Sequence, residues 1–350
     1  MSVKKKHMMR YLEDMNKDTV CILLTSVFGD YMKETIKCFK NNEDERNIRV
    51  VGCDIKPFNE FDVNYFNLDS FYQVPRCDCQ FYVNELLDIC KKEKVNFLIP
   101  CNTKELNSIS QRRSEFEAVG TKVIISNYSG LIIANDKVSL YDYMKKNGYS
   151  VPPQLCSHSL SLIVKFLEMH PHTKFCYKER NSCGGRGFGV LNRLEDIRYL
   201  IKDNKGTFLQ KYLSGKEYSV DLLVDNGKVL YSVVKLNLVM ENGVAQKSIV
   251  INDDRISKEC VRLCEELNLN GCIGFDLKED ENGSPFIIDC NPRLTATVSL
   301  CRKAGVNLPY LSLKKELGYN VYKDLSIKYG TSVTRKIVDF FTDESGAVIE

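Results

Sequence analysis

The sequence predicts a parallel α/β domain followed by an α+β domain, and three observations support this fold class. The first third of the 350 residues alternates apolar strand-like runs with helical patterns. The pattern then breaks at the double proline of Val151-Pro152-Pro153. Beyond this break, the sequence contains hairpin-like alternations rather than strand–helix repeats. The length suits two or three domains.

In the first part, four strands and three helices are expected. The strands are Val20–Thr25, Ile48–Asp54, Asn96–Pro100 and Lys122–Ser126, and the helices are Tyr31–Lys40, Phe81–Lys92 and Lys104–Ala118. Small or polar residues end these strands, and open parallel sheets place ligands at the carboxyl ends of their strands. A binding crevice is therefore expected there, although such residues also serve simply as helix caps.

In the second part, two hairpins and two helices are expected. The hairpins are Glu217–Leu236 around Asp225-Asn226-Gly227 and Cys272–Asn291 around Asn282-Gly283, because Asn-Gly is a strong two-residue turn signal. The helices are Lys137–Asn147 and about Ser257–Leu267.

Composition and missing motifs exclude several classes of function. With 49 Lys and Arg against 46 Asp and Glu, the net charge of +3 gives no indication of nucleic-acid binding. No apolar run approaches the roughly 18 residues of a membrane span, so we expect a cytoplasmic protein whose 15 cysteines are reduced. Four histidines leave little material for histidine triads or zinc centres, and Cys77 and Cys79 lack zinc-knuckle spacing. Phosphate-loop, nucleophile-elbow and complete dinucleotide motifs are absent from the sequence.

A pair of acids in the second hairpin is the most informative feature of the sequence. If Asn282-Gly283 forms a two-residue turn, Glu281 pairs with Ser284 and Asp276 lies opposite Asp289. Gly274 and Asn291 then share their face, and the other face carries only apolar residues, namely Phe275, Leu277, Phe286, Ile288 and Cys290. Directly opposed like charges repel unless they are neutralised. Two carboxylates and the Asn291 amide oxygen suit Mg²⁺, whereas either acid alone would be read as part of a solvated polar face.

Basic and glycine-rich segments supply candidate phosphate contacts. Arg293 follows the second acid and could bind a phosphoryl oxygen. The segment Gly184-Gly185-Arg186-Gly187-Phe188-Gly189 lets backbone amides approach phosphate closely, although tight turns and hinges use the same residues. Lys178, directly ahead of this loop, favours the phosphate interpretation, whereas Lys137 alone reads as an ordinary surface lysine.

Taken in order, these segments resemble the ATP-grasp superfamily, in particular its carbamoyl-phosphate synthase large-chain and biotin carboxylase branch. The similarity covers about 20–312 and rests on five motifs: Asp136-Lys137, Lys178 with its glycine loop, Gln210-Lys211-Tyr212-Leu213 with Gly215-Lys216-Glu217, Asp276, and Asp289-Cys290-Asn291-Pro292-Arg293. The resemblance implies a Rossmann-like pre-ATP-grasp domain at 18–126 and an ATP-grasp domain at 127–312. A polar tail at 1–17 and a C-terminal appendage at 313–350 complete the expected organisation.

The resemblance also implies a role for each matching residue. Lys137 and Lys178 would hold ATP phosphates beneath a loop containing Gly184, Gly185 and Gly187. Adenine would meet Gln210 and the backbone of Tyr212 and Leu213, and ribose would meet Glu217. Asp276, Asp289 and Asn291 would bind Mg²⁺, with Mn²⁺ as an alternative, and Arg293 and Lys178 would be catalytic. The sequence departs from the family pattern at Glu179, where the family often has proline, and at Gln210, where it often has an acidic side chain. It also departs at Asp276 and Asp289, which are shorter than the usual acids.

The expected function is ATP-dependent carboxylate–amine ligation through an acyl phosphate, releasing ADP and phosphate. Small-molecule carboxylates and amines, amino acids among them, would be the partners, with neither nucleic acid nor membrane, and the family implies a homodimer. Three alternatives stay open: a carbamoyl-phosphate synthase-like or kinase-like enzyme that stops at a phosphorylated product, a non-catalytic nucleotide-binding regulatory module, and an NAD-linked Rossmann oxidoreductase. The last rests on the first domain alone.

Overall fold

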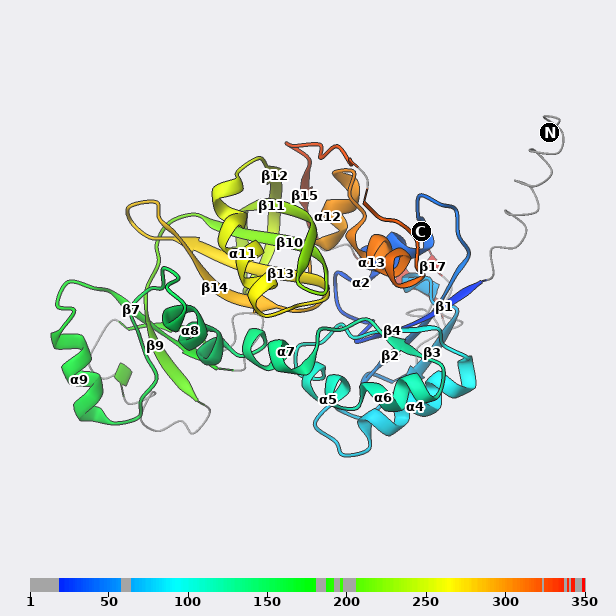
Figure 1. Cartoon of the computed structure of the whole chain (residues 1–350), viewed down its shortest axis with the longest axis horizontal. Coiled ribbons are helices and arrows are strands. Elements are labelled where there is room, and N and C mark those ends of the chain that lie inside the picture. Colours follow the sequence, from blue (N-terminus) through cyan, green and yellow to red (C-terminus); the bar gives the residue numbers. More distant parts are fainter. Residues whose placement is uncertain are drawn as a thin grey trace. The chain divides into compact units, whose positions relative to one another are not determined.

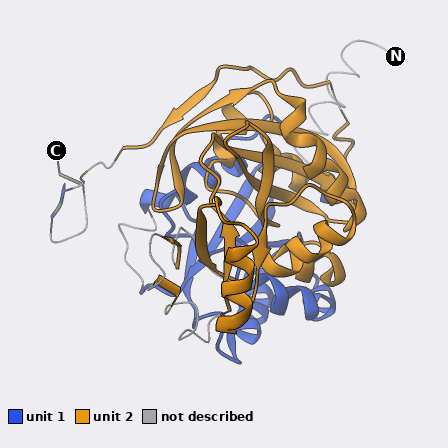
Figure 2. Ribbon diagram, turned by 90° about the vertical axis from the view of Figure 1, so that its left-hand side faces the viewer, with its two compact units in different colours: residues 1–124, 316–318, 340–350 blue, residues 125–315, 319–339 orange. Residues whose placement is uncertain are grey.

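A computed structural model describes residues 19–57, 64–180, 187–191, 196–197, 206–322, 324–336, 339, 341–343 and 348–349. The chain divides into two compact units (Figure 2). Unit 1 comprises Met1–Ile124, Glu316–Gly318 and Phe340–Glu350, and unit 2 comprises Ile125–Lys315 and Tyr319–Asp339. Among the described residues, none of the helices combines the length and the apolarity that crossing a membrane requires.

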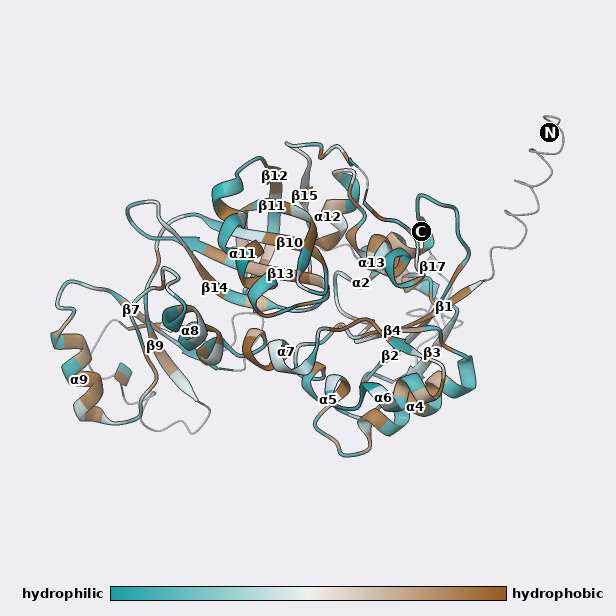
Figure 3. Cartoon of the chain, in the orientation of Figure 1, coloured by the Kyte–Doolittle hydropathy of each residue, from teal (hydrophilic) through white to brown (hydrophobic). Residues whose placement is uncertain are grey.

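Unit 1 is built on a five-stranded sheet in which every neighbouring pair is parallel (Figure 1). The strands are β1 (Val20–Thr25), β2 (Ile48–Asp54), β3 (Ser70–Gln73), β4 (Phe97–Ile99) and β5 (Lys122–Val123), in the order β3-β2-β1-β4-β5. The parallel α/β prediction is confirmed, and β1 and β2 have the predicted bounds. Strand β3 was not predicted from the sequence. Figure 3 shows β4 as hydrophobic, as a strand buried inside a sheet requires.

The helices of unit 1 include α2 (Met32–Lys40), α4 (Tyr82–Glu93), α5 (Leu106–Gln111) and α6 (Arg113–Ala118). The prediction of a single helix over Lys104–Ala118 is wrong, because Arg112 leaves helical geometry at ψ 18° and separates α5 from α6. The residues just ahead of the break include Asn107, Ser108 and Ser110, whose helix propensity is low.

Unit 2 contains a six-stranded antiparallel sheet in the order β14-β13-β10-β11-β12-β15. Its strands are β10 (Glu217–Asp225), β11 (Lys228–Glu241), β12 (Val244–Ile251), β13 (Gly271–Glu279), β14 (Pro285–Asn291) and β15 (Ser332–Thr334). One face forms a core with α8 (Lys137–Lys146) and α11 (Asp254–Glu266), to which Val220, Leu222 and Phe275 contribute. Side chains alternate between the faces of a strand, so the intervening residues form the opposite face.

A smaller antiparallel sheet of unit 2 has the order β6-β9-β7-β8. Its strands are β6 (Gln154–Leu155), β7 (Phe175–Glu179), β8 (Gly189–Val190) and β9 (Thr207–Lys211), and α9 (Leu160–Glu168) shares a core with it through Ile163. The remaining elements are α7 (Tyr128–Ala134), α12 (Val298–Lys303), α13 (Leu308–Glu316), β16 (Phe341–Thr342) and β17 (Val348–Ile349).

The two Asn-Gly turns adopt different loops. Between β10 and β11, Asn226 and Gly227 have φ angles of 46° and 83° and form the predicted two-residue turn, with Asp225 opposite Lys228. Between β13 and β14, Asp280 rather than Glu281 pairs with Ser284. The Asp280 carboxylate accepts hydrogen bonds from the backbone N–H groups of Asn282 and Ser284, both at 3.0 Å, and so stabilises a three-residue loop.

A bulge restores the predicted opposition of the two acids. The register shifts between Asp276 and Leu277, which pairs with Ile287, so that Ile288 is the extra residue and Asp276 lies opposite Asp289. The opposition is therefore confirmed, but the predicted turn is not. The predicted apolar face also needs correction, because the core buries Ile287, while Phe286 and Ile288 stay partly exposed.

Candidate functional site

The centre of the candidate site is the pair Asp276 and Asp289 on neighbouring strands β13 and β14. The Asp276 carboxylate accepts hydrogen bonds from the Ser219 hydroxyl at 3.1 Å and from the Asn291 amide nitrogen at 3.0 Å. Burial, and then the facing charge of Asp289, raise the pKa of Asp276 to about 6, although Ser219 and Lys235 act in the opposite direction. The fold therefore holds two repelling acids together at a cost in free energy.

Lys137 is the first residue of α8, and its ammonium lies 3.0 Å from the Asp289 carboxylate. The position of Lys137 is set by its neighbour, because Asp136 caps the helix by accepting from the Ser139 N–H at 2.7 Å. Arg180, which follows β7, donates to the same Asp136 carboxylate at 2.5 Å. The structure thus brings Lys137 into the acidic centre, which the sequence alone did not indicate without the family resemblance.

Lys178 lies on β7 and donates to the Gln210 side-chain oxygen on β9 at 2.7 Å. Gln210 in turn donates to the Gln154 side-chain oxygen at 2.8 Å. Burial lowers the pKa of Lys178, Lys137 and Lys278 lower it further, and Asp289 acts against them. Lys137, Lys178, Lys278 and Asp289 therefore lie close enough for their charges to act on one another.

Asn291 is the last residue of β14, and Arg293 follows it after Pro292. The Arg293 guanidinium donates to the Asn291 side-chain oxygen at 3.1 Å and to the Leu294 carbonyl at 2.8 Å. Asn291 thus links Asp276 to Arg293, with its nitrogen directed toward the acid. Coordination of a cation by the Asn291 oxygen would require this side chain to exchange its present partners.

The predicted ribose contact lies on β10, beside the strand of Asp276, whereas the predicted adenine contacts lie on β9 of the smaller sheet and just after it. Glu217, at the start of β10, forms an ion pair with Lys278, its register partner on β13. Tyr212 donates its backbone N–H to the Lys174 carbonyl at 2.7 Å, so a purine edge has to use another group of the Tyr212–Leu213 backbone. Leu213 is buried.

Only part of the predicted glycine loop can be placed. Gly184 and Gly185 lie outside the described residues, and Gly187 is described. Gly187 has a φ of 67°, and its carbonyl accepts from the Glu179 N–H at 3.2 Å. A Cβ atom at Gly187 would lie 2.3 Å from the Glu179 side chain, so another residue there would have to adopt a positive φ and displace that side chain.

Sequence reasoning missed several polar residues that share a sheet face with the acids. Ser219, on β10, lies opposite Asp276 on β13 and opposite Lys235 on β11. Asn237 donates to the Ser219 hydroxyl at 2.9 Å and accepts from Ser248 at 2.8 Å. The period-two row Glu217, Ser219 and Asp221 was a signal that could have identified part of this face.

The residues of this centre fit a hard cation. Among the described residues, no group of three or more His, Cys, Asp and Glu side chains could hold a metal ion. Two carboxylates and one amide oxygen instead suit Mg²⁺, which typically takes few protein ligands and completes its coordination with phosphate oxygens and water. A divalent cation would also relieve the repulsion between Asp276 and Asp289.

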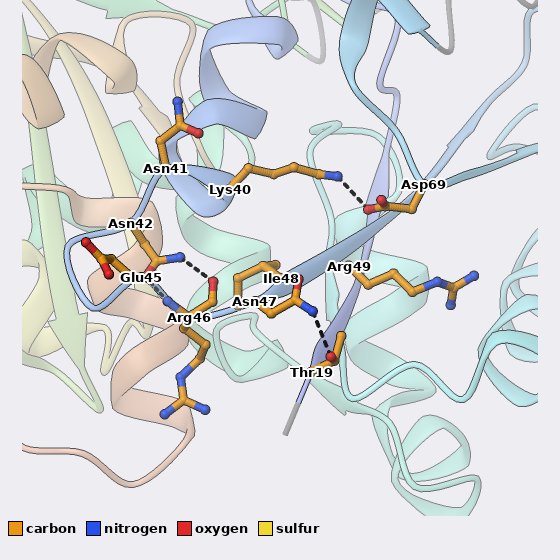
Figure 4. Close-up of a pocket in the computed structure, with 10 residues that line it drawn as sticks. All are labelled: Thr19, Lys40, Asn41, Asn42, Glu45, Arg46, Asn47, Ile48, Arg49 and Asp69. Carbon is orange, nitrogen blue, oxygen red and sulfur yellow. Dashed lines mark hydrogen bonds and ion pairs between the residues drawn. The ribbon is translucent and has the colours of Figure 1, made fainter. Parts of the chain in front are cut away.

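An open pocket of about 580 Å³ in unit 1 contains none of the predicted site residues (Figure 4). Asp69 lines this pocket and pairs with Lys40, 2.7 Å away, and Asn42 and Asn47 also have partners within the lining. Since these polar groups already pair with one another, the pocket gives no support for a nucleotide site.

Two family models match the chain. Residues 203–336 match the family described as ATP-grasp in the biosynthetic pathway with Ter operon, and residues 22–124 match the PylC-like, N-terminal domain. These matches agree with the order of domains inferred from the sequence motifs.

Two curated relatives are similar over about two thirds of this chain or slightly less. The carbamoyl phosphate synthase large chain of Sulfolobus acidocaldarius is 26% identical over 249 residues, which are 66% of this chain and 23% of the relative. The tyramine–L-glutamate ligase of Methanocaldococcus jannaschii is 24% identical over 220 residues, 61% of each chain. This chain therefore spans about a quarter of the first relative and less than two thirds of the second.

A solved structure supports the fold. N5-carboxyaminoimidazole synthetase from Staphylococcus aureus, complexed with ADP, superposes with a TM-score of 0.68 at 17% identity, covering 89% of this chain and 82% of that one. The predicted fold class, an α/β domain followed by an α+β domain of this architecture, is confirmed.

Proposed function

On the premise that this chain belongs to the ATP-grasp superfamily, we propose that it is an ATP-dependent carboxylate–amine ligase. The observation that carries the proposal is the convergence of Asp276 and Asp289 with Lys137 and Lys178. Acids alone would repel a nucleotide, and lysines alone would bind any anion. Together they suit a triphosphate that arrives with a divalent cation.

The proposed nucleotide roles are those that the family resemblance implies for the matching residues. Lys137 and Lys178 would contact phosphates, and Gln210, Tyr212 and Leu213 would meet adenine beside the strand that carries Glu217, the proposed ribose contact. Gly184, Gly185 and Gly187 belong to the proposed phosphate loop. Mg²⁺, when bound by Asp276, Asp289 and Asn291, supplies positive charge that neutralises phosphate oxygens.

The proposed reaction has two steps. A substrate carboxylate oxygen attacks the γ-phosphorus, the bond from phosphorus to the β–γ bridging oxygen breaks, and ADP leaves with that electron pair. An amine then attacks the acyl carbon, loses a proton, and expels phosphate, which carries away one oxygen of the original carboxylate. Arg293 and Lys178 would stabilise the charge on the transferring phosphoryl group.

Amino acids are the substrate class that we propose. The support is the relative named tyramine–L-glutamate ligase, a name that describes the joining of an amine to an amino acid. Activation explains the need for ATP, because a carboxylate is unreactive toward amines until its oxygen becomes part of a good leaving group.

The test is a screen for phosphate release with Mg²⁺ and ATP over pairs of amino acids and amines, with amide products identified by mass spectrometry. For an active pair, a carboxylate labelled with ¹⁸O should deliver one labelled oxygen to the released phosphate. Release of unlabelled phosphate together with an amide would contradict the acyl-phosphate route.

The alternatives give different results in the same screen. A kinase-like enzyme would consume ATP without an amine and accumulate a phosphorylated product. A carbamoyl-phosphate synthase-like enzyme would need bicarbonate and ammonia and would also accumulate a phosphorylated product in place of an amide. Hydroxylamine would trap either product only if it is an acyl phosphate. A regulatory module would bind ATP and release no ADP with any substrate pair. Each result would overturn the ligase proposal.

A further inference from the structure

The most deeply buried charged pair of unit 2 lies on the same sheet face as the candidate site. Lys235 on β11 is 0% exposed and Asp221 on β10 is 2% exposed, and their side chains form an ion pair. Burial alone would lower the pKa of Lys235, but Asp221 raises it, so the ammonium stays charged. Burying such a pair rarely gives a net gain in stability over apolar residues, so its presence calls for another explanation.

Two further partners of the pair come from the segment that directly follows Asn291 and Arg293, and the Cys301 thiol on α12 also donates to Asp221, at 3.3 Å. Lys235 donates to the Thr297 hydroxyl at 2.6 Å, and the Thr295 hydroxyl donates to the Asp221 carboxylate at 2.8 Å. Two residues of one short segment thus bind opposite ends of the same ion pair. The segment Leu294–Thr297 is thereby tied to β10 and β11.

Two further contacts hold the same segment. Arg335, which follows β15, donates through its guanidinium to the Ala296 carbonyl. Thr295 also packs against Gly274, where a Cβ atom would lie 2.1 Å from the Thr295 methyl group. Gly274, on β13, is the register partner of Asn291, so the segment packs against β13 directly beside this proposed metal ligand.

The geometry points to a positioning role for this pair. We propose that Asp221 and Lys235 hold the segment Leu294–Thr297 against the sheet and thereby fix Arg293 and Asn291 for phosphoryl transfer. The part of this inference that concerns turnover rests on the proposed function, whereas the part that concerns the segment does not. A displacement of about 1 Å at a reacting group can lower turnover about 10²-fold, so such a device has a large effect without touching substrate.

The test uses one double variant and one matched pair of single variants. Asp221→Asn with Lys235→Met removes both charges and leaves neither buried and unpaired. Thr297→Val removes only the hydroxyl that Lys235 contacts, and Thr297→Ser retains it. Tyr218→Phe is the control, because it removes a buried hydrogen bond to Glu279 elsewhere in the same sheet.

The first measurement is amide hydrogen exchange over residues 292–298 of the intact protein. The double variant should exchange about tenfold or more faster there, Thr297→Val should change in the same direction, and Thr297→Ser and Tyr218→Phe should resemble the wild type. If the double variant folds and its exchange over these residues is unchanged, the proposal is overturned. If the double variant does not fold, unchanged exchange in Thr297→Val overturns it.

The second measurement separates positioning from stability. The double variant should lower kcat by about 10–100-fold while KM for ATP changes by less than about threefold, because the proposed nucleotide contacts lie on other segments. Tyr218→Phe should lower thermal stability and leave kcat unchanged. If the wild type shows no ligase turnover, the proposed function fails, and the exchange measurement still decides whether the pair holds the segment. Faster exchange with unchanged kcat would overturn the catalytic part.

Discussion

Two carboxylates, one buried in unit 1 and one half-buried in unit 2, have contrasting surroundings. Glu105 in unit 1 is 1% exposed and accepts from the Thr25 hydroxyl, the Tyr82 hydroxyl and the backbone N–H groups of Cys101 and Asn102. Burial raises its pKa, and these four donors oppose the rise. Asp276 in unit 2 has two hydrogen-bond donors at its carboxylate and faces another acid.

The difference separates a structural acid from a candidate binding acid. Four donors around Glu105 replace the water that a carboxylate loses on burial, so that residue needs no ligand. The environment of Asp276 leaves repulsion that only a further positive charge can remove. Burial alone is therefore a poor guide to function, and the balance between donors and like charges is more informative.

The largest expected effect is the loss of turnover when the acid pair is disrupted. Asp276→Asn and Asp289→Asn should each lower kcat by about 10³-fold or more, because each removes a proposed ligand of the cation that neutralises the phosphates. Steady-state kinetics across a range of Mg²⁺ concentrations provides the measurement. Glu105→Gln is the matched control, and we expect its kcat to equal that of the wild type at temperatures where it is folded.

The second effect concerns Arg293, which the structure links to Asp276 through Asn291. Arg293→Ala should lower kcat by about 10²–10³-fold and change KM for ATP little, since the charge it stabilises develops on the transferring group. Arg255→Ala, at the start of α11 with a side chain 73% exposed, is the control for loss of one positive charge. Similar rates for both variants would remove Arg293 from the proposed mechanism.

The sequence predicted those parts of the molecule in which local signals agree with the final register. Strands β1 and β2 and the opposition of Asp276 and Asp289 are examples. The opposition holds because two departures from the predicted hairpin cancel: the loop has three residues instead of two, and the bulge at Ile288 shifts the register back by one residue. The relation of Ser219 to Lys235 was not predictable from the Asn226-Gly227 turn. A register shift between Leu223 and Val224 displaces every pair farther from the turn by one residue relative to the register that the turn predicts. A displacement of one residue reverses the face that each side chain of the partner strand occupies.

The third effect is on stability, and it tests the other half of the comparison. Glu105→Gln should lower the free energy of unfolding by about 2–3 kcal/mol, because a neutral amide oxygen accepts less strongly from these donors and its NH₂ group faces donors instead of acceptors. Denaturant titration of the intact protein provides the measurement. Glu115→Gln, which affects an exposed ion pair with Arg112, should change stability by less than about 1 kcal/mol. An equally small change for Glu105→Gln would mean that its four donors contribute nothing to the fold.

The smallest expected effect is a pH-dependent gain in stability from Asp276→Asn. The pKa of Asp276 is raised to about 6 in the folded protein, above the ordinary value of 3.8 for an unfolded aspartate. Below about pH 4 the carboxyl is largely protonated in both the folded and the unfolded state, so its ionisation does not lower the free energy of unfolding. As pH rises from about 4 to 6, the unfolded chain releases this proton more readily than the folded one, and the wild type loses stability relative to the asparagine variant.

Above about pH 6 this loss is complete, and the variant should be more stable than the wild type by on the order of 1–2 kcal/mol without Mg²⁺ and ATP. Denaturation at pH 4, 5, 6 and 7 measures the difference, and comparison with the wild type cancels the acids whose pKa is lowered, such as Asp136 and Glu93. Asp88→Asn, at an exposed ion pair with Lys91, should show no such trend. A difference that does not grow between pH 4 and 6 would mean that burial and the facing charge of Asp289 do not raise the pKa of Asp276 in the folded protein. Replacement of Asp276 would then reduce turnover, but its ionised carboxylate would not destabilise the folded protein.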